Sequence, residues 1–135
     1  ISPVGLFGAL YGSSSSTIHV LLPHSNRDSV LHSETRLLQD SDYMRDGAYF
    51  HSLTSSDPGY WRVENSLLRC FAPLSLSTVR IPGKARIFEW RIYANPNQVQ
   101  SRKKIHMFTQ AGEIKLFYQC GLTPVFFAET LIGLQ

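Results

Sequence analysis

Short apolar runs separated by Pro, Gly or Asn dominate the second half of the chain. In residues 85–93 (ARIFEWRIY), Phe88, Trp90 and Ile92 alternate with polar residues. This period of two is typical of a β-strand with one buried face. Similar apolar runs bounded by turn residues occupy 60–71, 103–109, 113–119 and 125–134. The second half is therefore predicted to be a series of strands, ending in a strand or turn at 125–134, with a tight hairpin turn at 110–112.

The first half has a more mixed pattern. Residues 4–11 are Gly-rich and apolar, at spacings that suit one or two helical turns, and residues 17–22 (TIHVLL) form a β-branched run typical of a buried strand. Residues 26–40 place apolar side chains one helical stripe apart, with Asp28 or Ser29 as the cap. Residues 40–58 are rich in Asp, Ser, Pro and Gly and are predicted to be a loop.

Strands with long irregular connections and little helix indicate an all-β fold, an antiparallel β-sandwich with one or two short helices. The 135 residues suit a single domain, 1–135. With 43% hydrophobic and 17% charged residues, the composition argues against disorder. No apolar run is long enough to span a bilayer, and the first residues lack the basic leader of a signal peptide.

The net charge of +3 is unevenly distributed. Residues 80–104 contain seven Lys and Arg against one Glu, a local net charge of +6, whereas the rest of the chain is at −3. Cations interleaved with aromatic rings suit single-stranded nucleic acid, although a solvated strand face and a charged loop also fit the pattern. The candidate contacts for nucleic acid or another subunit are Arg86, Arg91, Arg102, Lys103 and Lys104.

No pattern of catalytic or metal-binding residues stands out. Cys70 and Cys120 are far apart in apolar runs, which predicts buried thiols and neither a disulfide framework nor a zinc site. The five histidines lack the helical spacing with Glu that a zinc protease needs, and neither a G-x-S-x-G elbow nor a phosphate-binding glycine loop occurs. We expect no enzymatic activity, no cofactor and no metal.

Three segments together resemble the capsid proteins of picornavirus-like viruses. The segment PVGLFGALYGSSSSTIHVLL resembles the short helix, polar turn and strand of those proteins, and VENSLLRCFAPL resembles a later strand running into Pro. The most specific part is IHMFTQAGEIKLFYQCGLTPVFF, a strand, a small-Gly-acidic turn, an aromatic strand and Gly-x-x-Pro. The segment ANPNQVQ also resembles the plant members of the group.

The resemblance implies the C-terminal two thirds of a jelly roll, with the first two of its eight strands missing from this chain. Residues 17–22 would be the fourth strand, 61–70 the sixth and 85–93 the seventh, with the last two at 105–109 and 114–118. The family also implies a strand near residues 30–38, where the local pattern predicts a helix. The Leu134-Gln135 end would suit cleavage of a polyprotein by a viral protease.

The resemblance implies a structural subunit of a small RNA virus, located in the virion and, during assembly, in the host cytoplasm. Its partners would be copies of itself, sister subunits and the genomic RNA, arranged in an icosahedral shell. Interface aromatics would be Phe50, Tyr60, Trp61, Phe126 and Phe127, which also suit a core. The alternatives are a non-viral nucleic-acid-binding β-domain that uses residues 80–104 and a β-sandwich adhesion module.

Overall fold

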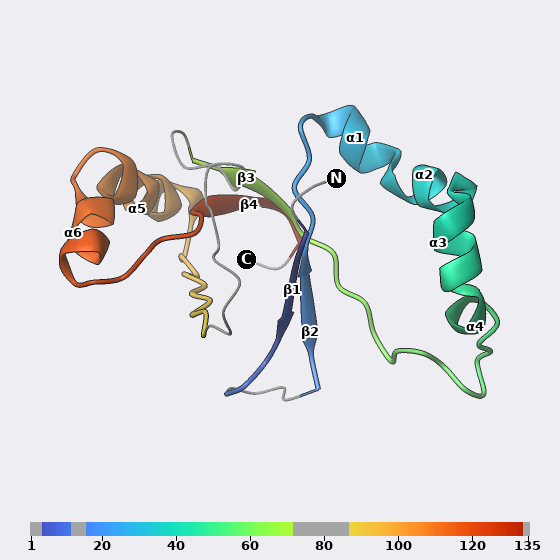
Figure 1. Cartoon of the computed structure of the whole chain (residues 1–135). Helices are drawn as coiled ribbons and strands as arrows, with labels where there is room; N and C mark the ends of the chain where they lie inside the picture. The colour runs from blue at the N-terminus through green and yellow to red at the C-terminus, as the bar shows by residue number, and fades with distance from the viewer. Residues whose placement is uncertain (1–3, 12–15, 72–86, 134–135) are drawn as a thin grey trace. The chain divides into compact units, whose positions relative to one another are not determined.

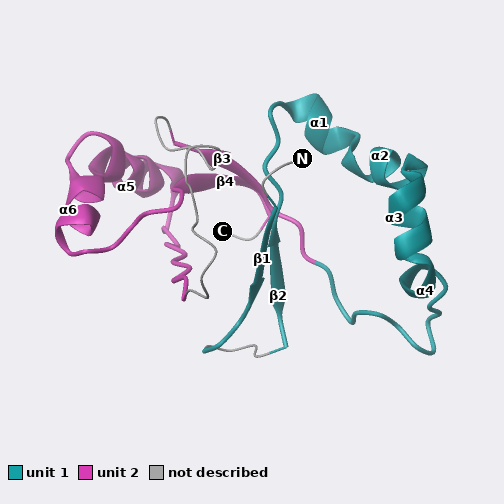
Figure 2. Ribbon diagram, viewed as in Figure 1, with its two compact units in different colours: residues 1–63 teal, residues 64–135 magenta. Residues whose placement is uncertain are grey.

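The computed structural model describes residues 4–11, 16–71 and 87–133 (Figure 1). The chain divides into two compact units, residues 1–63 and 64–135, which are described separately below (Figure 2).

The first unit begins with a two-stranded antiparallel hairpin. Strand β1 (Gly5–Gly8) pairs with β2 (Ile18–Leu21), with Leu6 opposite Val20. The strand predicted at 17–22 is thus confirmed, and its β-branched residues account for it. Its predicted burial is wrong, because the hairpin has no second layer to cover it and Ile18 and Val20 are more than half exposed. The helix predicted at 4–11 is wrong: the two glycines of β1 weaken helix formation, and pairing with β2 gives their backbone its hydrogen bonds.

Four short helices follow the hairpin: α1 (Arg27–Leu31), α2 (Ser33–Gln39), α3 (Ser41–Asp46) and α4 (Ala48–His51). The side chain of Asn26 caps α1 by accepting from the Ser29 N–H at 2.8 Å. Asp40 caps α3 by accepting from the backbone of Asp42 and Tyr43, each at 3.0 Å. The helical prediction for 26–40 is confirmed with a different cap, whereas the loop predicted from residue 40 begins only after α4.

The second unit combines a second two-stranded sheet with two helices. Strand β3 (Leu67–Cys70) pairs antiparallel with β4 (Ala128–Ile132), and the register shifts between Leu67 and Leu68. Helices α5 (Gln98–Thr109) and α6 (Glu113–Gln119) lie between these strands in the sequence.

Phe108 of α5 is the centre of the second unit's core, with only 5% of its surface exposed. Its ring centroid lies 4.9 Å from that of Phe127, 5.7 Å from Tyr93 and 6.3 Å from Phe117. No other side chain in the described residues is buried to this degree, so the core of each unit is thin.

The jelly-roll β-sandwich, with or without its first strands, is a wrong prediction. The described residues form two separate two-stranded sheets and six helices. Segments 103–109 and 113–119, expected to be strands, belong to α5 and α6, and residues 87–93 form no regular element. In the predicted strand at 60–71 only residues 67–70 form a strand, β3. Within the described parts of the chain, no helix is long and apolar enough to cross a membrane.

Candidate nucleic-acid interface

The predicted basic residues have different environments in the structure. Arg86 lies outside the described residues. Arg91 is exposed and pairs with Glu89, and Lys104 is half-buried and pairs with Glu113. Arg102 and Lys103 are exposed on α5. The four described cations therefore differ in whether their charges are already paired.

Arg91 is a structural residue. Its guanidinium binds both carboxylate oxygens of Glu89, at 2.7 and 2.8 Å, and lies 5.4 Å from the centroid of the Phe117 ring. This bidentate hydrogen bond lowers the pKa of Glu89 and raises the pKa of Arg91 further above its ordinary value. Because Glu89 already offsets the charge of Arg91, this guanidinium is a weaker candidate for binding a phosphate than an unpaired cation.

Lys104 has a similar structural role. Its Nζ lies 4.8 Å from the centroid of the Tyr93 ring and 5.1 Å from that of Phe108, and donates to Glu113 Oε1 at 3.4 Å. The residue ties α5 to α6 and covers the aromatic core. The second oxygen of Glu113 is buried without a hydrogen-bond partner among the described residues, which leaves that carboxylate dependent on Lys104.

Arg102 and Lys103 are the two predicted cations that remain available. Both are exposed, and neither forms an ion pair or side-chain hydrogen bond with another described residue. Because successive residues of a helix point about 100° apart, their charges fan out over α5. Only Arg102 lines the neighbouring cavity.

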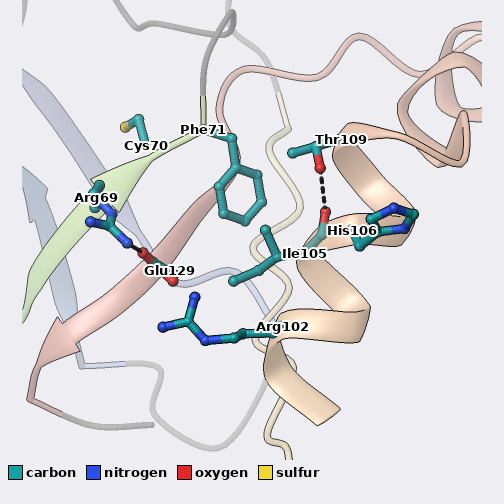
Figure 3. Close-up of a pocket in the computed structure, with 8 residues that line it drawn as sticks. All are labelled: Arg69, Cys70, Phe71, Arg102, Ile105, His106, Thr109 and Glu129. Atoms are coloured by element: carbon teal, nitrogen blue, oxygen red, sulfur yellow. Dashed lines mark hydrogen bonds and ion pairs between the residues drawn. The ribbon is translucent and has the colours of Figure 1, made fainter. Parts of the chain in front are cut away.

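A cavity of about 400 Å³ lies between α5 and the β3–β4 sheet (Figure 3). Helix α5 contributes a stripe at spacings of three and four residues, strand β3 and the residue after it form the opposite wall, and β4 adds one carboxylate. The lining residues are Arg69, Cys70, Phe71, Arg102, Ile105, His106, Thr109 and Glu129.

The cavity combines positive charge with an apolar wall. Arg69 forms an ion pair with Glu129 across the sheet, so the Arg102 guanidinium is the unpaired charge of the lining. In Figure 3 the Phe71 ring faces the Ile105 side chain, with Arg102 on the side of the Arg69–Glu129 pair. Such a lining suits an anion that carries an apolar or aromatic part.

The sequence interpretation identified Arg102 but missed Arg69, Phe71 and Ile105. The available signal was the spacing of residues 102, 105, 106 and 109, which lie on one face of a helix. The prediction of a strand at 103–109 hid this signal. Arg69 and Phe71 had no comparable signal, because they join the site only through the pairing of β3 with β4.

The predicted interface aromatics divide between the two units. Tyr60 and Trp61 are exposed, Trp61 at 94%, and Phe50 stacks on Tyr60 with ring centroids 6.0 Å apart. Phe126 and Phe127 pack into the second unit, where Phe126 contacts Trp90 at 5.5 Å between centroids. Core packing therefore accounts for these last two.

The prediction of buried thiols is wrong, since both cysteines are exposed and free. Partial burial of the Cys70 thiol against the cavity still raises its pKa. Across the described residues, no group of His, Cys, Asp and Glu is placed to hold a metal ion.

Comparison with known proteins finds no match. This holds for protein families, for curated sequences and for solved structures.

Proposed function

We propose that the chain binds single-stranded nucleic acid, without sequence preference, through the exposed cations of α5 and the adjoining cavity. The observation that carries the proposal is the pair Arg102 and Lys103. Both are exposed cations that form no ion pair with another described residue, and they lie beside a cavity lined in part by Phe71. Binding of this kind combines phosphate neutralisation with stacking of bases on aromatic rings.

The distribution of charge between the two units supports this proposal. Residues 64–135 contain nine Lys and Arg against four Asp and Glu, a net charge of +5, whereas residues 1–63 carry −2. The second unit therefore attracts a polyanion and the first does not. Non-specific binding of nucleic acid typically has a dissociation constant of roughly 1–100 μM at physiological salt.

The test is fluorescence anisotropy with a labelled single-stranded oligouridylate. We expect Arg102→Ala and Lys103→Ala each to weaken binding several-fold, because each removes about one phosphate contact. Arg45→Ala is the matched control, since Arg45 of the first unit is equally cationic but already pairs with Asp42 and Asp46. Equal affinity in all three variants and in the unaltered chain would overturn the proposal.

Lys104 is left unchanged in this test because its contacts support the fold of the second unit. A triple alanine change at 102–104 would also remove the contacts of Lys104 with Tyr93, Phe108 and Glu113. Lost binding would then report unfolding of the second unit as readily as lost phosphate contacts.

Assembly with other copies of the chain is a second candidate, and the exposed apolar surface favours it. On one face of the β1–β2 hairpin, Leu6, Ile18 and Val20 are all more than half exposed. An isolated two-stranded hairpin is marginally stable in water, and exposed apolar patches are typical of interfaces. The coat-subunit hypothesis needs such contacts, although the jelly roll it presumed is absent from the described residues.

Sedimentation velocity over a range of protein concentrations tests this second candidate. We expect association that strengthens with concentration and is weakened by Ile18→Ser, whose side chain lies on the exposed hairpin face. A monomer at every concentration would rule out assembly by the chain alone and leave the nucleic-acid proposal intact.

A further inference from the structure

We propose that the cavity between α5 and the β3–β4 sheet is the seat of one nucleotide of the bound strand, with its base against Phe71 and its phosphate at Arg102. The inference rests on the proposed nucleic-acid binding and goes further. It assigns a nucleotide-binding role to Phe71, in addition to the charge supplied by α5.

Phe71 is placed to act as a fixed stacking platform. It directly follows β3, and its backbone N–H donates to the Phe127 carbonyl at 2.9 Å, which extends the pairing between the two strands and holds the residue in place. The ring is only half-buried and faces Ile105 across the cavity (Figure 3). An aromatic ring held beside an aliphatic wall offers a base a π-face on one side and apolar contact on the other.

Arg102 is the cation best placed to receive the phosphate. Arg69 is neutralised by Glu129, whereas Arg102 has no charged partner among the described residues. A guanidinium offers five N–H donors in a planar fork that matches phosphate oxygens. Because Arg69 and Glu129 offset each other, the lining has a single uncompensated cation, Arg102, and therefore suits one phosphate and not a run of several.

The size of the cavity agrees with this assignment. Its volume of about 400 Å³ lies near the lower end of the range for small-molecule sites. The neighbouring nucleotides of the strand would then lie along the exposed surface of α5, where Lys103 is available. The cavity would anchor the strand and α5 would guide its backbone.

The experiment titrates the full chain with adenosine 5′-monophosphate and with ribose 5-phosphate, followed by backbone amide NMR. The two probes share the phosphate and differ in the base. We expect the adenosine compound to bind roughly tenfold more tightly and to shift the amides of β3 and α5. Phe71→Leu should remove this preference, while Arg102→Ala should weaken both probes.

The failure of this inference can be told apart from failure of the proposed function. Equal binding of the two probes, or no binding of either, would contradict the proposal that the cavity binds one nucleotide. If oligouridylate binding still depends on Lys103, the proposed function survives that result. If the oligouridylate does not bind at all, the proposed function is itself wrong.

Folding of the Phe71 variant is checked by its amide spectrum. Phe71→Tyr serves as the conservative variant and should keep the preference for the base, because it keeps the ring. Should Phe71→Leu fail to fold, the comparison of the two probes on the unaltered chain and on Phe71→Tyr decides the matter alone.

Discussion

Phe108 shows how much of the second unit depends on one side chain. Its ring contacts the rings of Tyr93, Phe117 and Phe127, and the Lys104 ammonium lies over it. Because these contacts come from α5, from α6 and from the segments on either side of them, Phe108 links the helices to the chain that leads into β4. The cavity wall formed by α5 is held through the same residue.

We predict that Phe108→Ala lowers the free energy of unfolding by about 3–5 kcal/mol, the usual cost of removing a buried Phe. With so thin a core, a loss of this size removes most of the stability of the second unit. Urea unfolding followed by tryptophan fluorescence measures it. Leu116→Ala is the control: Leu116 of α6 is 57% exposed, so the change should stay within about 0.5 kcal/mol. A wild-type unfolding midpoint for Phe108→Ala would contradict the assignment of the core.

At the scale of elements, the turn between α5 and α6 depends on a left-handed residue. Gly112 has φ of 82° and precedes the first residue of α6, and its carbonyl accepts from the Lys115 N–H at 3.0 Å. A Cβ built on Gly112 would meet no atom within 4 Å, so the demand for glycine comes from the backbone alone. The sequence predicted a turn at Gly112, but the turn joins two helices and not the two strands of the expected hairpin.

We predict that Gly112→Ala destabilises the second unit by about 1–2 kcal/mol, the cost of the left-handed region for a residue with Cβ. Gly112→Asn should cost less, because Asn tolerates this region. The matched control is Gly8→Ala in β1, where an added Cβ also meets nothing but φ is not positive. Thermal unfolding followed by circular dichroism measures all three, and equal effects at the two glycines would contradict the backbone explanation.

The same two helices show where sequence reasoning stops. In 103–109, Ile105 and Met107 alternate as in a strand, yet Ile105 and Phe108 also match one helical face. The decisive signal was Asn97, which follows Pro96 and caps α5 by accepting from the Gln100 N–H at 3.0 Å. In a seven-residue run both periods fit, so local capping had to decide between them.

The candidate site was predictable only where it is local in sequence. Arg102 and Lys103 could be chosen from the local excess of Lys and Arg, and both side chains are exposed. The structural role of Lys104 does not follow, because its partners Tyr93 and Glu113 are eleven and nine residues away. Phe71 reaches the cavity through strand pairing, which no single segment encodes.

At the scale of the whole chain, opposite net charges fall on the two units. The first unit carries −2 together with four short helices, and the second carries +5 together with the cavity. Opposed charges of this kind favour a polyanion on residues 64–135 over residues 1–63. The two proposed functions would therefore use different units of the chain.

The most direct test of nucleic-acid binding is the dependence of oligouridylate affinity on salt. Each phosphate contact to a single strand contributes about −0.7 to the slope of log K against log salt concentration. We predict a slope near −1.4 for the unaltered chain, from Arg102 and Lys103, which falls by about half in Lys103→Ala and is unchanged in Arg45→Ala. Affinity that does not vary with salt, or a slope that Lys103→Ala leaves unchanged, would contradict the account.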